Sequence, residues 1–311
     1  MTAAAPPPST PLPRPPVHPE RLAYLGTPEM AVPPLRALHA AGFDLAVVVT
    51  RPDKRRGRRG EPSPSPVKAA ALELGLPVVH DPEAALEHGA DLGVVVAYGR
   101  ILRRPLLERL PMVNLHFSLL PRWRGAAPVE RAILAGDDRT GVCVMAVDET
   151  LDTGDVYARP EVPIDPSAHA DVVARELLWS GSALLVGALR AGLADPEPQV
   201  GPTTYAEKLT SDDRHIDWTV SAVQIHRQVR VGGAWTTFRG RRFKVLDAEV
   251  ADAVGVGRRG RPGELDGDEV ATGDGGLRLV QVQPEGKAPT DARSWANGAR
   301  PADGERFGGE G

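Results

Sequence analysis

Short apolar segments alternate with helix-forming segments over the first half of this chain, and this alternation limits the fold more than any other feature. Residues Leu92 to Tyr98 (LGVVVAY) form a continuous apolar run, typical of a strand buried on both faces of a sheet. Further strands are predicted at 22–25, 45–50, 77–80 and 142–147, and helices at 29–40, 67–74 and 128–135. Strands alternating with helices predict an α/β domain with an open, mostly parallel sheet and flanking helices.

The predicted strand around Asn114 carries a polar face. In the segment 113–121 (VNLHFSLLP), Asn114, His116 and Ser118 alternate with apolar residues, so an extended strand would place them on one face. Open α/β sheets bind their ligands outside the carboxyl ends of strands, where this segment ends. An amide N–H and an imidazolium there could stabilise the oxyanion that forms when an amine attacks a carbonyl.

A carboxylate is predicted to join these side chains. The strand at 142–147 is followed by the loop 148–155 (DETLDTGD), which we expect to open on the same edge of the sheet. Asp152 could then orient His116, keep it charged and help to take the proton of the attacking amine. Gly154 would let a substrate approach the backbone closely. The predicted catalytic residues are therefore Asn114, His116 and Asp152.

Three other kinds of site have weaker support. A serine hydrolase could use Ser118, His116 and Asp152, but Ser118 lacks the G-x-S-x-G turn and lies two residues from its base. No H-x-x-x-H, H-x-x-E-H or cysteine pair indicates a metal site. The single Gly26 at the first turn is not the G-x-G-x-x-G of dinucleotide-binding domains.

The sequence changes character after a long helix predicted at 168–191. One helix is predicted at about 221–231, and short alternating strands follow at 243–250, 269–272 and 277–282, separated by glycine and aspartate turns. This pattern predicts a small antiparallel β-barrel of OB-like type. We expect a disordered proline-rich extension at 1–20, a catalytic domain at 21–194, a linker at 195–208 and the barrel domain at 209–311.

The charge distribution points to an anionic partner. Because the formal net charge is −4, such a partner would need a local basic patch. Six of the nine residues at 51–59 are basic: Arg51, Lys54, Arg55, Arg56, Arg58 and Arg59. They follow a strand at the ligand edge, so a polyanion held there would lie beside the predicted site. The predicted barrel, a fold that often binds oligonucleotides, adds Arg227, Arg230, Arg239, Arg241, Arg242 and Lys244.

Cysteine content and hydropathy indicate the compartment. Cys143 is the only cysteine, so no intramolecular disulfide can form. No apolar run approaches the ~20 residues of a membrane helix, and residues 1–20 lack the apolar core of a signal peptide. We therefore expect a cytoplasmic protein without membrane attachment or metal, and we expect a monomer.

Several motifs resemble those of the 10-formyltetrahydrofolate-dependent formyltransferases. They are N-x-H-x-S-L-L-P at 114–121, R-W-R-G-A-A-P at 122–128 and L-D-T-G-D at 151–155, with further matching segments from Leu25 to Trp218. The resemblance implies 10-formyltetrahydrofolate as formyl donor, and as acceptor the α-amine of methionine esterified to initiator tRNA. It implies catalytic roles for Asn114, His116 and Asp152, and folate contacts for Ser118, Leu119, Leu120 and Pro121. It also implies that residues 51–59, with Arg58 as the key arginine, approach the acceptor end of the tRNA.

Three alternatives stay open at this point. A sugar-nucleotide N-formyltransferase or a formyltetrahydrofolate hydrolase would share the Asn/His/Asp set. The basic segment and the added barrel favour the tRNA-directed activity over both. A non-catalytic RNA-binding protein would need the barrel but not the complete catalytic set.

Overall fold

The computed structural model describes residues 11–55, 61–251 and 260–308. The chain divides into two compact units. The first contains the chain up to Gly125, Gly141–Val162 and Arg175–Tyr205, and the second contains Ala126–Thr140, Pro163–Ala174 and the chain from Ala206 onward. The long helix α5 (Ala170–Ala191) therefore contributes its first residues to the second unit and the rest to the first.

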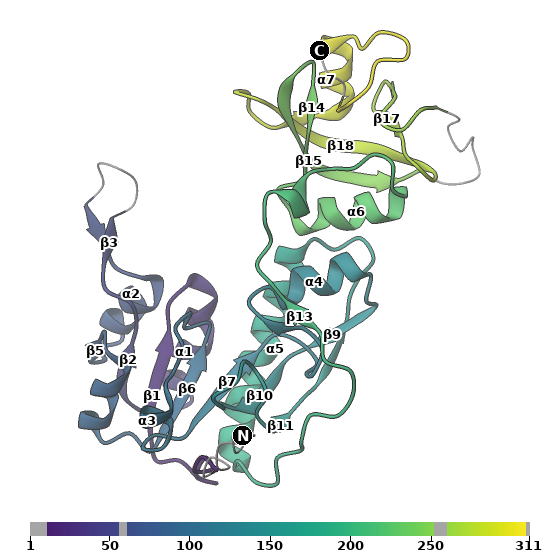
Figure 1. Cartoon of the computed structure of the whole chain (residues 1–311). Coiled ribbons are helices and arrows are strands. Elements are labelled where there is room, and N and C mark those ends of the chain that lie inside the picture. Colours follow the sequence, from purple (N-terminus) through teal and green to yellow (C-terminus); the bar gives the residue numbers. More distant parts are fainter. Residues whose placement is uncertain (1–10, 56–60, 252–259, 309–311) are drawn as a thin grey trace, which may run out of the picture. The chain divides into compact units, whose positions relative to one another are not determined.

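The first unit is built on a seven-stranded sheet with the order β11-β10-β7-β6-β1-β2-β5. Its strands are β1 (Arg21–Gly26), β2 (Asp44–Val49), β5 (Val78–Val79), β6 (Leu92–Val96), β7 (Met112–His116), β10 (Cys143–Ala146) and β11 (Val156–Ala158). The strands from β5 to β7 pair in parallel, whereas β10 pairs antiparallel with both β7 and β11. Figure 1 shows this sheet with its helices, which confirms the predicted α/β domain.

Side chains alternate between the two faces of the central strands. Ala23 and Leu25 of β1 share a buried cluster with Leu106 and Leu107 of α3 (Arg104–Leu107) and with residues of η2 (Pro82–His88). Tyr24 points to the opposite face, where its hydroxyl donates to the Ala31 carbonyl at 2.5 Å. This contact ties β1 to η1 (Glu29–Ala31), which leads into α1 (Val32–Ala40), and α2 (Pro66–Glu73) packs beside α1.

Helix α5 satisfies the length and composition requirements of a membrane-spanning helix, so the expectation that no segment approaches them is wrong. Core helices of soluble proteins often satisfy the same requirements. Leu177, Leu185 and Leu189 are at most 2 % exposed. Gly181 lies so close to the sheet that an added Cβ would meet a methyl group of Val142 at 3.0 Å. The apolar side of this part of α5 is thus buried on the sheet of the first unit.

The segment before β1 is attached to the first unit. The Leu193 amide donates to the Val17 carbonyl at 2.8 Å. The amides of Glu20 and Arg21 donate to the Asp91 carboxylate at 2.7 and 3.0 Å. Residues 1–10 of the predicted extension lie outside the described residues.

In the described part of the chain, six shorter strands lie outside the two main sheets. They are β3 (Lys54–Arg55), β4 (Pro62–Ser63), β8 (Arg124–Gly125), β9 (Arg139–Gly141), β12 (Glu161–Pro163) and β13 (Tyr205–Ala206).

The second unit contains an antiparallel sheet with the order β14-β15-β18-β17-β16, and β19 pairs with β18. The strands are β14 (Trp235–Phe238), β15 (Arg241–Val250), β16 (Leu265–Asp266), β17 (Glu269–Ala271), β18 (Gly276–Pro284) and β19 (Thr290–Asp291). The unit also contains η3 (Asp212–Arg214), α4 (Pro128–Ala135), α6 (Ala222–Val231) and α7 (Ala292–Ala299). The predicted C-terminal antiparallel sheet domain is thereby confirmed.

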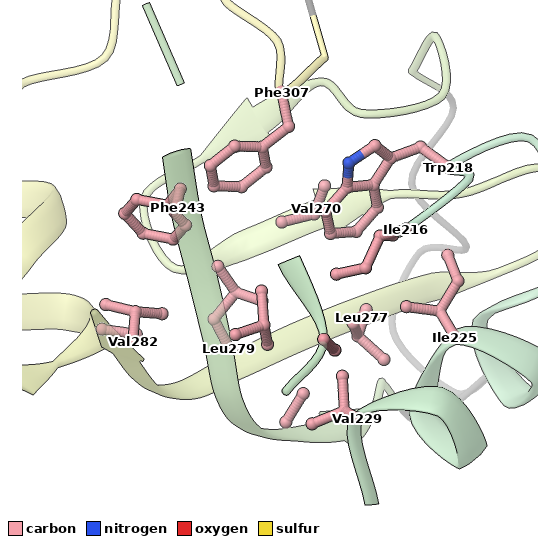
Figure 2. Close-up of a cluster of buried hydrophobic side chains, with 14 of the residues drawn as sticks. Ile216, Trp218, Ile225, Val229, Phe243, Val270, Leu277, Leu279, Val282 and Phe307 are labelled. Atoms are coloured by element: carbon pink, nitrogen blue, oxygen red, sulfur yellow. The ribbon is translucent and has the colours of Figure 1, made fainter. Parts of the chain in front are cut away.

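Aromatic and aliphatic side chains fill the core of this second unit, as Figure 2 shows. Val229 of α6 and Leu277 and Leu279 of β18 lie in this cluster. The rings of Trp218 and Phe307 stack with their centroids 5.3 Å apart. The buried Trp218 indole donates to the Thr236 hydroxyl at 3.1 Å, so its polar atom is satisfied. Phe307, close to the end of the described residues, thus belongs to the core of the second unit.

Candidate active site

Asn114 and His116 of β7 both face Asp152. Asn114 Nδ2 lies 3.5 Å from one carboxylate oxygen, and His116 Nδ1 lies 3.6 Å from the other. The side chains of His116 and Asp152 are only 6 % and 13 % exposed. Both distances exceed that of a strong hydrogen bond, as is common where catalytic contacts tighten around a substrate. The structure therefore brings the three predicted catalytic residues together in a largely buried cluster.

Asp152 reaches this cluster by a route different from the expected one. Because β10 runs antiparallel to β7, Cys143 pairs with His116 and Ala146 pairs with Val113. The loop after β10 therefore leaves the sheet beside the start of β7, and the prediction that both loops open on the same edge is wrong. The Val147 amide donates to the Met112 carbonyl at 2.9 Å, which marks this exit point. The loop must fold back along the strands to bring Asp152 to His116.

Glycine makes this return path possible. A Cβ on Gly154 would lie 2.0 Å from the Ala146 carbonyl oxygen, so the loop packs directly on the backbone of β10. Asp152 itself has φ +52°, in the left-handed region that costs most residues about 1–2 kcal/mol and that aspartate tolerates better than most. The amide of Gly125 donates to Asp152 Oδ2 at 2.8 Å. A backbone N–H thus holds the carboxylate in place.

The surroundings of His116 determine which ring nitrogen faces the cluster. Nε2 lies 2.9 Å from the Trp123 carbonyl oxygen. A carbonyl only accepts hydrogen bonds, so Nε2 must carry hydrogen and donate. Nδ1 is then the nitrogen that faces Asp152, and it carries hydrogen only in the imidazolium form. His116 can therefore donate a hydrogen bond into the cluster only when it is charged.

Ser118 does not continue the polar face of β7. The strand ends at His116, and Ser118 lies in the bend that follows, with 0 % exposure. Its hydroxyl donates to the Arg122 carbonyl at 2.6 Å. The expectation that Asn114, His116 and Ser118 share one strand face is thus wrong for Ser118, because the extended backbone stops two residues earlier. A buried hydroxyl that donates within its own loop is unsuited to be the nucleophile of a hydrolase.

Neither a reactive thiol nor a metal cluster lies in the described part of the chain near this site. Cys143 is buried and donates to the Ser118 carbonyl at 3.0 Å. Burial raises the pKa of the Cys143 thiol to about 11, so it is neutral at pH 7. Among the described residues, no group of three or more histidine, cysteine, aspartate or glutamate side chains could hold a metal ion.

A cavity of about 310 Å³ lies beside the loop that follows β7. Three of the four residues predicted to contact the folate, Leu119, Leu120 and Pro121, contribute to its wall. The wall is completed by Arg122, Arg159, Glu161, Val200 and Pro202. Arg159 donates to the Leu120 carbonyl at 3.1 Å. The described residues that line this cavity do not include Asn114, His116 or Asp152, so it is distinct from the catalytic cluster.

Part of the predicted basic segment forms a hairpin in the first unit. Strand β3 pairs antiparallel with β4, and the exposed Lys54 and Arg55 lie on β3. Arg51 precedes the hairpin, whose base is held by the ion pair between Asp53 and Lys68 at 2.8 Å. The other predicted residues, Arg56, Arg58 and Arg59, lie outside the described residues.

The predicted basic track of the second unit is only partly available to a ligand. Arg230 is 6 % exposed and donates to the carbonyls of Ala168 and Asp165, both at 2.8 Å, so its expected phosphate contact is wrong. Arg239 forms an ion pair with Glu305 at 2.6 Å. Arg241 and Lys244 are exposed.

Several residues that were not predicted as site residues surround the cluster. Arg124 and Gln199 hydrogen-bond to each other, and Gln199 also contacts the Asp152 loop. Thr204 contacts the backbone of Trp123. Both Gln199 and Thr204 lie in the segment predicted as a linker. Thr204 begins one of the segments that match the formyltransferases (204–209), whereas no motif or periodicity marks Gln199. The R-W-R-G motif did mark the region of Trp123 and Arg124, although not its structural role.

Comparisons with known sequences agree on one family. Residues 20–189 match the formyl transferase family, and residues 208–300 match its C-terminal domain. Methionyl-tRNA formyltransferase of Symbiobacterium thermophilum is 45 % identical over 92 % of this chain and 95 % of its own length. The enzyme of the same name from Roseiflexus sp. (strain RS-1) is 43 % identical over 93 % of this chain and 96 % of its own length.

Solved structures share the fold. The N-formyltransferase from Helicobacter canadensis, in complex with folinic acid and dTDP-3-aminofucose, has a TM-score of 0.65 at 18 % identity. This match covers 85 % of this chain and 98 % of that one. HypX from Aquifex aeolicus in complex with tetrahydrofolic acid has a TM-score of 0.62 at 18 % identity, over 90 % of this chain and 47 % of HypX. At this level of identity the likeness concerns the fold alone.

Proposed function

The chain belongs to the formyl transferase family, and we propose that it transfers a formyl group from 10-formyltetrahydrofolate to the α-amino group of methionine carried by initiator tRNA. The product would be the N-formylmethionyl-tRNA used to start translation. The observation that carries this proposal is the cluster of Asn114, His116 and Asp152. The chain that forms it matches the sequences of two methionyl-tRNA formyltransferases along nearly their whole length.

The cluster has the groups that formyl transfer requires. Attack of the amine on the formyl carbon would produce a tetrahedral oxyanion. Asn114 Nδ2 and His116 Nδ1, which both lie toward Asp152, could donate to that oxygen. One such donor in a dry site is worth about 3 kcal/mol of transition-state stabilisation. Because Nε2 is engaged by the Trp123 carbonyl, His116 would act as an imidazolium, and the nearby Asp152 carboxylate would stabilise that charge.

Asp152 is also the group best placed to handle the proton. In the transfer, a bond forms between the amine nitrogen and the formyl carbon, and the bond between that carbon and N10 of the folate breaks. The amine loses one proton and N10 gains one, so no oxidant or metal is required. Asp152 would accept the amine proton, directly or through a water molecule, and pass it toward the leaving nitrogen.

Two further parts of the first unit are proposed to hold the substrates. Ser118, Leu119, Leu120 and Pro121 would contact the folate, with the buried Ser118 hydroxyl shaping the loop and the other three forming a wall. Arg51, Lys54, Arg55, Arg56, Arg58 and Arg59 would contact the tRNA backbone near its acceptor end. The exposure of Lys54 and Arg55 on their hairpin supports this part of the proposal. We further propose a monomeric protein that acts in the cytoplasm, where translation begins.

The test incubates the purified full chain with 10-formyltetrahydrofolate and charged initiator tRNA, and measures formylmethionine after release from the tRNA. Formation of formylmethionine at a rate proportional to enzyme supports the proposal. Two parallel reactions replace the acceptor, one with a dTDP-amino sugar and one with buffer alone. Formylation of the sugar without formylation of the tRNA would favour a sugar-nucleotide enzyme. Release of formate at the full rate without an acceptor would favour a hydrolase.

A further inference from the structure

We infer that Gln199 and Thr204, in the segment predicted as a linker, are positioning residues that hold Asp152 and His116 in their catalytic geometry. This inference rests on the proposed function. It assigns these two residues an active role in the first unit, where the segment and the site both lie.

Gln199 spans the backbone around Asp152. Its Nε2 donates to the carbonyl of Asp152 and to the carbonyl of Gly154, both at 2.9 Å. The first carbonyl belongs to Asp152 itself, which has φ +52°, and the second lies two residues later. A left-handed residue persists only where its surroundings determine its backbone strongly. The two hydrogen bonds from one amide group provide that restraint, because both carbonyls must face Gln199 together.

Arg124 in turn holds the amide of Gln199. The guanidinium of Arg124 donates to Gln199 Oε1 from Nε at 3.1 Å and from Nη2 at 2.6 Å. This fixes which end of the amide faces the carbonyls, because the oxygen is occupied by the arginine. The next residue along the chain is Gly125, whose amide donates to the Asp152 carboxylate at 2.8 Å. Asp152 is therefore held through its backbone by Gln199 and through its side chain by Gly125.

Thr204 supports the histidine side of the site. Its hydroxyl accepts from the Trp123 amide at 2.9 Å, and its carbonyl accepts from the Arg124 amide at 2.9 Å. Trp123 has φ +63°, a second left-handed backbone. Its carbonyl receives the hydrogen bond of His116 Nε2 at 2.9 Å, which sets the tautomer and the ring orientation. Thr204 thus fixes the peptide that fixes His116.

The main test replaces Gln199 by methionine in the full chain, because Gln199→Met keeps the length of the side chain and removes every hydrogen bond. Glu207→Gln is the matched control, since the Glu207 side chain is exposed in the same segment. We expect kcat for formylation to fall by about 10- to 100-fold in Gln199→Met, since a displacement near 1 Å costs that much. We expect the KM values for both substrates to change less than about two-fold, and Glu207→Gln to behave as wild type.

Combining Gln199→Met with Asp152→Asn separates a positioning role of Gln199 from a general structural effect of its loss. If Gln199 acts through the Asp152 carboxylate, adding Gln199→Met to Asp152→Asn should lower the single-turnover rate by less than about two-fold further. An equal loss in both backgrounds would overturn the inference, and so would a wild-type kcat in Gln199→Met.

Two variants of Thr204 give a further test, which does not require the Gln199→Met variant to fold. Thr204→Val keeps the shape but removes the hydroxyl, whereas Thr204→Ser retains it. We expect Thr204→Val to lose kcat by at least about ten-fold and Thr204→Ser to recover most of the rate. Equal rates in the two variants would contradict the role of the hydroxyl. Failure of the proposed function and failure of this inference give different results. If the wild-type protein does not formylate methionyl-tRNA, the proposed function is wrong and this inference is wrong with it. If the wild-type protein formylates methionyl-tRNA and the variants do so at the same rate, only this inference is wrong.

Discussion

Gly154→Ala is the sharpest perturbation of the Asp152 loop that the structure offers. The methyl group would lie 2.0 Å from the carbonyl oxygen of Ala146 and 2.8 Å from its carbon. Both atoms belong to the backbone of strand β10, which is paired on both sides, so they cannot move as a flexible side chain would. Gly154 is not among the residues with positive φ, so alanine is conformationally acceptable there. The effect of the substitution will therefore come from this clash.

The size of the effect follows from the displacement. Real Cβ contacts essentially never lie under 3.0 Å, so the loop must move outward by about 1 Å. The Gly154 carbonyl accepts from Gln199, and Asp152 lies two residues earlier, so this movement will carry the carboxylate away from His116. A misplacement of this size costs about 10²-fold in rate. We expect kcat for formyl transfer to fall by that factor, while overpacking destabilises the fold by about 1–3 kcal/mol.

The measurement compares single-turnover formylation with unfolding in urea for the same preparation. Gly187→Ala in α5 is the matched control, because nothing lies within 4 Å of a Cβ at that position. Alanine should leave the rate unchanged there and stabilise the helix by up to about 1 kcal/mol. Wild-type kcat in Gly154→Ala would refute the argument, since it would mean that the position of the Asp152 loop does not limit the reaction.

Three further predictions concern other parts of the chain. Hydrogen bonds from Arg131, followed by that of the Thr210 amide, lower the pKa of Asp213 from its ordinary 3.8 to about 2. Asp213→Asn should therefore lower the free energy of unfolding by about 1–2 kcal/mol at pH 7, and the difference should disappear as the pH falls from about 4 to 2 in a urea titration series. Phe307→Ala should lower that free energy by about 3–5 kcal/mol, measured by the same method, because the ring is 3 % exposed in the core of the second unit. Replacing Lys54 and Arg55 together by serine should weaken binding of tRNA and reduce the slope of log K against log salt by up to about 2, and an unchanged slope would remove both from the interface.

Local signals predicted the individual elements well. Helix α4 was expected at 128–135 and is observed at Pro128–Ala135. Proline at its first position needs no hydrogen bond from its own nitrogen, and Gly136 with φ +80° ends the helix in a left-handed cap. The buried strand β6 was predicted equally well, because a fully apolar run between turns is typical of a strand in the middle of an α/β sheet. Such elements depend on their own residues, so their sequence is sufficient.

The direction of β10 could not be predicted in the same way. An apolar run such as the one at 142–147 is compatible with either direction, because the direction depends on which strand edge is free when the chain returns. The consequence for the site is large, since it determines from which end the Asp152 loop approaches. The error over Ser118 has a related cause. Alternation of polar and apolar residues continues past His116 in the sequence, but the extended backbone does not.

The contacts around the cluster were hidden for a third reason. The His116 ring is held by a backbone carbonyl, and the Asp152 carboxylate by a backbone amide. Backbone groups are present at every position, so no residue type in the sequence indicates that its backbone will hold a catalytic side chain. Gln199 uses its side chain, but it lies 47 residues from Asp152 in the chain. A lone glutamine at that separation has no periodicity that a sequence pattern could detect.

The free energies of the contacts around Asp152 explain how its loop can be both strained and stable. A left-handed aspartate costs up to about 1–2 kcal/mol. Three hydrogen bonds oppose this cost directly: two from Gln199 to backbone carbonyls and one from Gly125 to the carboxylate. At about 1 kcal/mol each for the neutral pairs and about 2 kcal/mol for the charged one, they exceed it by a small margin. Removing both hydrogen bonds of Gln199 would leave the loop nearly balanced between its catalytic position and a relaxed one. The fold would survive, because the sheet does not depend on this loop, but the carboxylate would spend part of its time away from His116. A loss of rate without a comparable loss of stability is therefore the expected signature of residues that act on Asp152 in this way.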